Sequence, residues 1–300
     1  MSEFDLIAKI RATTRVNERV ILGIGDDCAA IRVRPDCELL VTTDMLMDGR
    51  HFVLGEATPE QIGRKAMGVN LSDIAAMAGT PIGAVVAVAL PRANAVRVAE
   101  GLQRGISQMA ERYDVPLIGG DTNAWNGPLV VSITVFGEVK IGQAIRRSGA
   151  KIGDAIFVTG PLGGSLLGRH LNVEPRVREA QLLASAAKIH AMIDISDGLA
   201  SDLAHILEES GGLGAILDWE AIPIHADSLR SAEQDRRTPL DHALNDGEDF
   251  ELLFTASRED IVRIEAALPS VRCIGEMMRE PGIRLRSGEN ITPRGFDHLA

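Results

Sequence analysis

Apolar runs typical of strands alternate with amphipathic helical stretches, and this alternation restricts the fold more than any other feature. A helix is predicted over about residues 58–78, because Thr58-Pro59-Glu60-Gln61 combines an N-cap, a proline at the first helical position and a capping-box glutamine. The run IGAVVAVAL after Gly79-Thr80-Pro81 predicts a buried strand. A second helix over about 94–113 precedes the strand-like stretches VPLIGG and PLVVSITVFGEV. This order predicts an α/β or α+β fold.

A second alternating series follows VKIGQAIRRSGAKIGD, a stretch near residues 140–155 that is rich in glycine and charge and is typical of a domain boundary. AIFVTG and AMIDI are predicted strands, and GGSLLGRHL is a predicted helix start. SDGLASDLAHILEESGG predicts a helix with Ser196 as its N-cap and Gly211 as its C-terminal stop. We therefore expect one domain over residues 1–140 and another over residues 150–300, a size suited to a chain of 300 residues.

Composition excludes several classes of protein. A formal charge of -11 with 3% aromatic residues provides no basic stripe, so we expect no nucleic-acid partner. The 3 cysteines form no CxxC pair, which fits a reducing cytoplasm rather than a disulfide framework or a zinc finger. We expect no membrane association, because the apolar run 82–90 is too short to span a bilayer and charges interrupt any signal-peptide core at Glu3, Asp5, Lys9 and Arg11.

Aspartates stand at the ends of the predicted strands. Asp44 ends ELLVTTD, Asp121 ends VPLIGGD, and Asp194 and Asp197 bracket the strand-to-helix turn in MIDISDG. Ligands of open α/β sheets bind at strand ends. Taken singly, each aspartate is more often a structural turn or N-cap residue, but together they indicate a shared site.

Three further aspartates extend this acidic set. Asp26 and Asp27 lie side by side in GIGDDCAA, where no lysine or arginine is near to neutralise them, and only one of the two is expected to point into a shared site. Asp73 lies in the apolar stretch VNLSDIAAMA of the first long helix and is not expected to point freely into water. A set made only of acids matches the ligands of Mg²⁺, which takes oxygen ligands and commonly bridges to substrate phosphates.

Glycine-rich stretches and basic or imidazole side chains add weaker signals. IGGDT and VTGPLGGSLLG could hold phosphate through backbone N–H groups, but neither has the ending of a P-loop, and protein-kinase motifs are absent from the sequence. Arg146-Arg147 is either a solvated pair or a contact for polyphosphate. His51 could touch a ligand or be an ordinary loop or core histidine. The other histidines are expected to be structural or superficial: His170, His190, His205, His225, His242 and His298.

Seven segments resemble, in order, those of the thiamine-monophosphate kinase family: GIGDDCAAI, VTTDMLMDGRHF, IGRKAMGVNLSDIAAMAGTP, LIGGDT, RRSGAKIGD, IDISDGLASDL and DGEDFELLF. The resemblance covers nearly the whole chain, and NLSDIAAM, GGDT and DISDGL are its most specific parts. The family belongs to the ATP-binding superfamily of aminoimidazole ribonucleotide synthetase. The resemblance implies an N-terminal domain that binds ATP and Mg²⁺ and whose strands form a barrel across a homodimer, together with a C-terminal α/β domain.

The resemblance also implies roles for individual residues. The magnesium ligands would be Asp27, Thr42, Thr43, Asp44, Asp73, Asp121, Asp194 and Asp197. Contacts to the nucleotide would come from Gly120, Asp121, Arg147 and Ser196. Catalysis would involve Asp121, Asp197 and Arg147. The thiamine phosphate pocket would be formed by His51, Glu248 and Phe296, because an acid and an aromatic ring suit a cationic thiazolium.

The sequence departs from the family pattern at two places. The usual Gly-Gly-Glu-Asp-Tyr is here Asn245-Asp246-Gly247-Glu248-Asp249-Phe250, and the C-terminal aromatic lies in RGFDHL as phenylalanine, where tyrosine or tryptophan is more usual. Both departures concern the substrate side and leave the metal side unchanged.

The implied reaction is transfer of the ATP γ-phosphoryl group to thiamine monophosphate, giving thiamine diphosphate and ADP. A phosphate monoester is largely a dianion at neutral pH, so no general base is required. The difficulty is to bring two polyanions together, and an acidic cluster that holds several Mg²⁺ ions overcomes it. Two alternatives stay open: an ATP-dependent relative that acts on another acceptor, and a nucleotide-binding protein without turnover.

Overall fold

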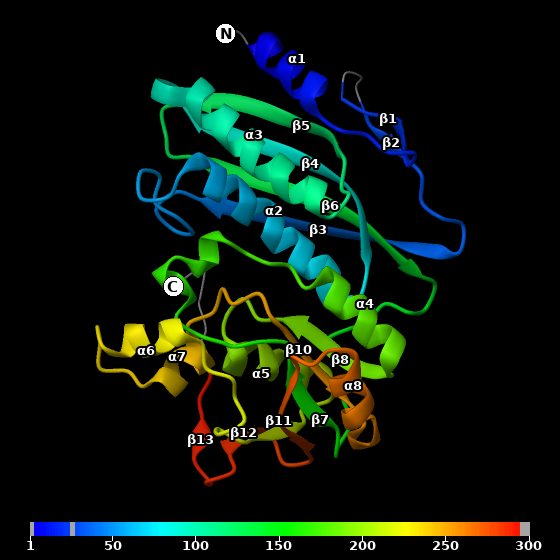
Figure 1. Ribbon diagram of the computed structural model, residues 1–300, viewed down its shortest axis with the longest axis vertical. Coiled ribbons are helices and arrows are strands. Elements are labelled where there is room, and N and C mark those ends of the chain that lie inside the picture. Colours follow the sequence, from blue (N-terminus) through cyan, green and yellow to red (C-terminus); the bar gives the residue numbers. More distant parts are fainter. Residues whose placement is uncertain (1–2, 25–27, 295–300) are drawn as a thin grey trace. The chain divides into compact units, whose positions relative to one another are not determined.

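The computed structural model describes residues 3–24 and 28–294, and the chain divides into two compact units (Figure 1). The first, called the N-terminal unit, comprises Met1–Ile74, Gly79–Gln143 and Leu171–Val173. The second, called the C-terminal unit, comprises Ala75–Ala78, Ala144–His170 and Glu174–Ala300.

The described part of the N-terminal unit is built on a four-stranded sheet in the order β3-β6-β4-β5. β6 pairs antiparallel with β3 and β4, and β4 pairs parallel with β5 through the crossover helix α3. The strands are β3 (Cys37–Met47), β4 (Thr80–Pro91), β5 (Leu117–Trp125) and β6 (Val130–Lys140). The remaining elements are α1 (Glu3–Thr13), the paired strands β1 (Val20–Leu22) and β2 (Ala30–Ile31), α2 (Pro59–Ala76), η1 (Arg92–Asn94) and α3 (Ala95–Arg112).

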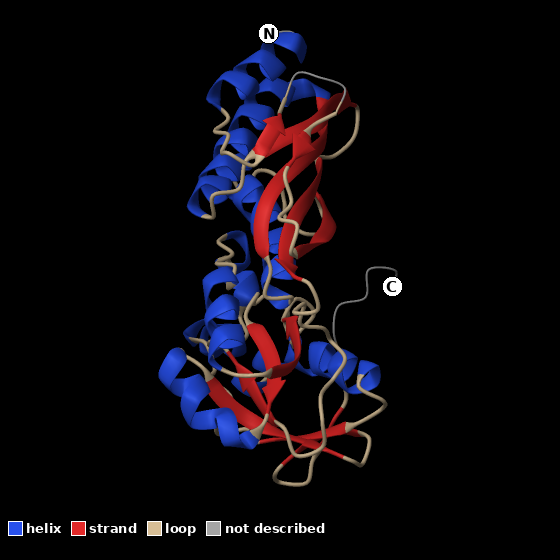
Figure 2. Cartoon of the chain, turned by 90° about the vertical axis from the view of Figure 1, so that its right-hand side faces the viewer, coloured by secondary structure: helices blue, strands red, loops and turns tan. Residues whose placement is uncertain are grey.

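Helices α2 and α3 cover one face of this sheet (Figure 2). The predicted start of α2 is confirmed: Gln61 N donates to Thr58 Oγ1 at 3.2 Å and Thr58 N donates to Gln61 Oε1 at 2.9 Å, a complete capping box. Gly105 of α3 must be glycine, because a Cβ there would collide with the carbonyl oxygen of Glu60 on α2. This close approach lets both helices bury apolar side chains against the sheet, among them Ile62, Leu71, Leu102 and Ile106.

The other face of β3 carries apolar side chains that no described residue buries. Successive residues of a strand point to opposite faces, so Leu39, Val41, Met45 and Met47 lie together. They are 49%, 58%, 56% and 41% exposed. Such an apolar strip, interrupted by Thr43, is typical of an interaction surface.

The described part of the C-terminal unit contains a seven-stranded mixed sheet in the order β13-β12-β9-β11-β7-β10-β8. β12 and β9 are parallel, and the other neighbouring pairs are antiparallel. The strands are β7 (Ala155–Val158), β8 (Ile189–Asp194), β9 (Gly214–Leu217), β10 (Leu252–Ala256), β11 (Arg272–Met278), β12 (Gly282–Leu285) and β13 (Asn290–Ile291).

The helices of this unit pack around that sheet. They are η2 (Ser165–Leu167), η3 (Arg169–Leu171), α4 (Val177–Ala186), α5 (Leu199–Glu209), α6 (Ala226–Ala232), α7 (Pro239–Asn245), η4 (Arg258–Asp260) and α8 (Ile261–Ala267). Helix α5 buries Leu199, Leu203 and Ile206 in the main core of this unit. Within the described ranges, no helix combines the length and the apolar character needed to cross a bilayer.

Two local predictions in this unit are wrong. GGSLLGRHL does not start an α-helix: it forms the two short 3-10 helices η2 and η3, and α4 begins only at Val177. Ser196 is not the N-cap of α5, because that position belongs to Gly198, which has a φ of 106°. The predicted stop is confirmed, since α5 ends at Glu209 and Gly211 adopts a φ of 94°.

Candidate active site

The first acidic group joins a strand and a helix of the N-terminal unit. Thr42 and Asp44 project from the same face of β3 toward α2, where the Thr42 hydroxyl donates to Asp73 Oδ2. Burial, together with the neighbouring Asp73 carboxylate, raises the pKa of Asp44 to about 7. Two carboxylates in contact favour a proton or a divalent cation between them, so this pair has the chemistry of a metal site.

Asp44 and Asp121 were expected at strand ends, and this prediction is wrong. β3 continues to Met47 and β5 continues to Trp125, so both aspartates lie inside strands. β3 continues past Asp44 because Leu46 pairs with Val131 of β6. β5 continues past Asp121 because Trp125 pairs with Pro91 of β4.

Asp121 projects from the opposite face of the sheet. The register aligns Asp44 with Ile133 of β6, Ile133 with Val86 of β4, and Val86 with Gly120 of β5. Asp121 follows Gly120 and therefore points away from the helices, where Asn123 Nδ2 donates to its Oδ2 at 2.9 Å. Thr43 also faces that side and accepts from Thr134 Oγ1 at 3.0 Å. Within this unit the sequence-predicted ligands therefore divide between two faces.

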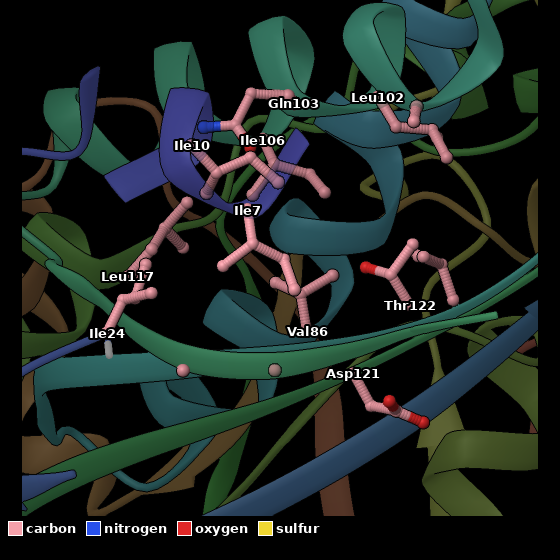
Figure 3. Close-up of a pocket in the computed structure, with 14 residues that line it drawn as sticks. Ile7, Ile10, Ile24, Val86, Leu102, Gln103, Ile106, Leu117, Asp121 and Thr122 are labelled. Carbon is pink, nitrogen blue, oxygen red and sulfur yellow. The ribbon is translucent and has the colours of Figure 1, made fainter. Parts of the chain in front are cut away.

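A pocket of about 140 Å³ lies between α1, α3 and the β4–β5 pair (Figure 3). Apolar side chains surround it, with the amide of Gln103 at its rim and the backbone of β5 forming its floor. Gly120 leaves this floor open, and a Cβ there would collide with the carbonyl oxygen of Val86. The lining includes Ile7, Ile10, Val86, Leu102, Ile106 and Leu117, and Figure 3 shows Asp121 on the other side of the strand.

The second acidic group lies in the C-terminal unit, at the turn between β8 and α5. Asp194 ends β8 as predicted and is buried, Asp197 lies in the turn, and Asp202 lies in the first turn of α5. Asp197, Asp202 and His205 each place one potential ligand atom within 4.8 Å of the others. Burial and the carboxylates of Asp194 and Asp197 raise the pKa of Asp202 well above its usual range.

The segment 246–251 is hydrogen-bonded to that same turn. Glu248 N donates to Ser196 O at 2.7 Å, and Phe250 N donates to Ile195 O at 2.8 Å. Glu248 and Phe250 both have a φ of 51°, which is unfavourable for residues other than glycine and is typical of functional segments. Phe250 is 6% exposed, so the departure from the family's tyrosine lies in the core of this unit.

The glycine-rich stretch 160–168 does not present a free phosphate cradle. Gly163 N donates to both carboxylate oxygens of Asp249 at 2.9 Å, and Gly164 N donates to Asp246 Oδ2 at 2.9 Å. Carboxylates from the same chain therefore take the backbone donors that a phosphate would need.

The other predicted residues have the following positions. His51 Nδ1 accepts from Met47 N at 3.0 Å, which leaves the proton of a neutral ring on Nε2. The carbonyl oxygen of His51 accepts from the fully buried Lys65 at 2.8 Å. Arg147 is exposed, and Ser196 is half-buried. Asp26, Asp27, Phe296 and His298 lie outside the described residues.

The remaining histidines form local contacts within the C-terminal unit. His225 Nδ1 accepts from Asp227 N at the start of α6, and the rings of His190 and His242 contact Asp154 and Asp246. His205 is exposed but belongs to the acidic group at the β8–α5 turn.

Two residues of the candidate site were not predicted from the sequence. Asp202 carried the same signal that drew attention to Asp73, a carboxylate on an otherwise apolar helix face between Leu199 and Leu203. Gln103 gave no comparable signal, because an amide on an amphipathic helix is ordinary.

Comparisons with known proteins identify the family of this chain. Residues 25–139 match the family "AIR synthase related protein, N-terminal domain", and residues 151–286 match "AIR synthase related protein, C-terminal domain". The thiamine-monophosphate kinase of Rhodopirellula baltica is 42% identical over 310 residues, covering 99% of this chain and 97% of the relative.

Solved structures give the same result. The thiamine-monophosphate kinase of Stenotrophomonas maltophilia K279a superposes with a TM-score of 0.84 at 35% identity, covering 97% of this chain and 98% of the other. AaThiL complexed with AMPPCP and TMP superposes with a TM-score of 0.79 at 29% identity, covering 98% and 95%. These matches confirm the predicted two-domain α/β architecture. The chain belongs to the thiamine-monophosphate kinase family, within the AIR synthase related proteins.

Proposed function

We propose that this protein phosphorylates thiamine monophosphate with ATP, giving thiamine diphosphate and ADP, in the cytoplasm. Relatives named thiamine-monophosphate kinase match nearly the full length of the chain, and AaThiL is complexed with AMPPCP and TMP. AMPPCP differs from ATP by a methylene in place of the β,γ-bridging oxygen. The observation that carries the proposal is the presence of two groups of crowded carboxylates, Asp44 with Asp73 and Asp194 with Asp197 and Asp202.

The donor set of these groups fits Mg²⁺. Carboxylate and hydroxyl oxygens are the ligands that this ion takes. The raised pKa of Asp44 reflects first its burial and then the neighbouring Asp73 carboxylate, and a bound cation offsets both. When bound, Mg²⁺ neutralises the charges of ATP and of the acceptor phosphate and brings them together. We assign the ion-holding role to Asp27, Thr42, Thr43, Asp44, Asp73, Asp121, Asp194 and Asp197.

We assign the nucleotide base to the pocket beside β5. Adenine has two apolar faces and a hydrogen-bonding edge, and ligand pockets typically combine apolar walls with a few polar groups. Here Leu102, Ile106 and Val86 offer the walls and Gln103 offers an amide with both donor and acceptor groups. Gly120 lies in the floor of this pocket and is assigned to the nucleotide, as are Arg147 and Ser196. Asp121 points to the other face of the sheet (Figure 3), so it is assigned to the ions that hold the phosphates and not to the base.

The acceptor is assigned to His51, Glu248 and Phe296. Met47 N–H donates to Nδ1 of His51, so a neutral His51 carries its proton on Nε2 and cannot accept a proton there. The carboxylate of Glu248 suits the cationic thiazolium ring. The dianionic phosphate attacks directly, in line with the bond to the leaving ADP, and no covalent enzyme intermediate forms.

The apolar strip on β3 supports a homodimer. Leu39, Val41, Met45 and Met47, on either side of Thr43, form an apolar surface that a second copy of the chain could cover. A barrel formed by the N-terminal strands of two copies would place Thr43 and Asp121 beside the same interface.

An assay with Mg-ATP and thiamine monophosphate tests the proposal. Chromatography should detect thiamine diphosphate and ADP in equal amounts, and EDTA should abolish both. ADP without thiamine diphosphate, produced only when another acceptor is supplied, would indicate a relative with a different substrate. Binding of ATP without any ADP would indicate a protein that binds nucleotide but does not turn it over.

A further inference from the structure

The turn between β8 and α5 is held in place by a side chain that lies beyond it in the sequence. Asp202 Oδ2 accepts from Ser196 N and from Asp197 N, both at 3.1 Å. Asp202 is itself fixed, because it is 1% exposed and its own N–H donates to Gly198 O at 3.0 Å. One buried carboxylate oxygen therefore determines the direction of two successive peptide groups.

Burying the Asp202 carboxylate lowers the stability of the fold unless other interactions compensate for it. α5 otherwise buries Leu199, Leu203 and Ile206, and an apolar residue at position 202 would continue that face. A carboxylate there lies close to those of Asp194 and Asp197, and burying an additional charge in an acidic group is unfavourable. The two N–H groups that it accepts are the compensation visible in the structure.

The other side of the same turn is bound to the segment that carries Glu248. Ser196 O accepts from Glu248 N at 2.7 Å, and Gly247 fits beside it only because it lacks a side chain: a Cβ would lie 2.5 Å from Ser196 O. The peptide groups of Ser196 thus link Asp202 on one side to Glu248 on the other. Moving this turn would displace Asp197 and Glu248 together.

We propose that Asp202 is a positioning residue: by accepting both N–H groups it fixes the Ser196–Asp197 turn, so that the Asp197 carboxylate meets a divalent cation and Glu248 meets the acceptor. This inference deepens the proposed function and rests on it. Asp202 acts through its hydrogen bonds, not as a metal ligand. Its role therefore requires an acceptor oxygen and does not require a negative charge.

Two variants separate these requirements. Asp202→Asn keeps an oxygen that can accept both N–H groups, whereas Asp202→Ala removes it; Glu208→Ala, an exposed acid on the same helix, is the matched control. For each folded variant we would measure Mn²⁺ binding by electron paramagnetic resonance, the Mg²⁺ concentration for half-maximal rate, and kcat and KM for both substrates.

We expect Asp202→Ala to raise the half-maximal Mg²⁺ concentration and the KM for thiamine monophosphate at least about tenfold, because two buried N–H groups lose their acceptor. Asp202→Asn should stay within about threefold of wild type on both measures, because its oxygen preserves the turn. A simple loss of folded protein would lower the active fraction and leave both constants unchanged.

Two results would overturn the inference. Asp202→Ala with wild-type Mn²⁺ affinity and wild-type constants would show that the turn needs no such support. Asp202→Asn with Mn²⁺ affinity reduced as much as in Asp202→Ala would show that the negative charge itself acts. If Asp202→Ala does not fold, Asp202→Asn is compared with wild type: Mn²⁺ affinity within about threefold supports the inference, and a loss of about tenfold or more overturns it. Mn²⁺ binding can be measured without turnover. If the wild-type protein makes no thiamine diphosphate, the proposed function is wrong, but the role of Asp202 in cation binding can still be tested.

Discussion

Asp44, on β3, and Asp73, on α2, place their carboxylates against each other within the N-terminal unit. Thr42, two residues before Asp44, donates to Asp73, so all three side chains meet between the strand and the helix. Like charges in contact lower the stability of the fold, and that cost is relieved when a divalent cation binds. The same contact should therefore make the metal-free protein less stable and the metal-bound protein active.

Replacing Asp73 separates these two effects. Asp73→Asn keeps the size and the acceptor for Thr42 but removes one charge, so the melting temperature in EDTA should rise by a few degrees. The stabilisation by Mg²⁺ should shrink. Turnover should fall at least about a hundredfold, as for other lost electrostatic contacts in catalysis.

Thermal unfolding in EDTA and in Mg²⁺, with a parallel activity assay, measures all three quantities. Glu38→Gln, at an exposed acid on the same strand, should change none of them. A lower melting temperature of Asp73→Asn in EDTA would contradict the idea that the pair is under repulsion.

The pocket beside β5 makes a prediction about nucleotide affinity. Gln103→Leu keeps the approximate volume of the side chain and removes its amide, so the KM for ATP should rise about tenfold or more while the KM for thiamine monophosphate stays unchanged. Gln108→Leu, at an exposed position of the same helix, is the control. Steady-state kinetics with each substrate varied in turn measures both KM values. An equal rise in the two KM values would show that the nucleotide base does not bind in this pocket.

Local sequence signals predicted the elements whose determinants lie close together. The capping box of Thr58 and Gln61 spans four residues, and the stop at Gly211 depends on its own backbone, so both follow from the sequence. The alternation of strand-like and helical stretches was also sufficient to predict the α/β class, because burial gives strands and helices different spacings of apolar residues along the sequence.

Contacts between distant residues account for the errors. The glycine-rich stretch was a candidate phosphate site, but its Gly163 amide is taken by Asp249, 86 residues away. Ser196 looked like an N-cap, yet the acceptor for that turn is Asp202, whose role appears only once the helix is placed. The faces of Asp44 and Asp121 depend on the register of four strands, which periodicity in one strand does not determine.

Asp249 predicts how stability depends on pH. Burial outweighs the ion pair with Arg169 at 2.7 Å and raises the pKa of this carboxyl to about 7. The folded protein therefore binds a proton that the unfolded chain releases near pH 4, so this carboxyl favours folding at low pH, and that contribution is lost as the pH rises from about 4 to about 7. Each pKa unit corresponds to about 1.4 kcal/mol.

The change Asp249→Asn removes this titration. The unfolding free energy of wild type minus that of the variant should be larger at pH 5 than at pH 8, because subtraction cancels the groups that both proteins share. Urea unfolding at the two pH values measures it, with the exposed Glu209→Gln as control. A difference that increases toward pH 8 would mean that the carboxylate, paired with Arg169, is the stable form.

Asp246 belongs to the segment that departs from the family's usual Gly-Gly-Glu-Asp-Tyr, and its contacts are extensive. Its carboxylate accepts from Gly164 N at 2.9 Å and contacts Arg237 at 2.7 Å and the buried ring of His242 at 2.9 Å. Asp246→Ala leaves these donors without that acceptor, so the unfolding free energy should fall by about 1–3 kcal/mol. A double-mutant cycle with Arg237→Ala should give a coupling of at least about 0.5 kcal/mol, the lower end for residues in one network. Strictly additive losses in urea unfolding would show instead that the Arg237 contact adds nothing, and that Asp246 acts through Gly164 and His242.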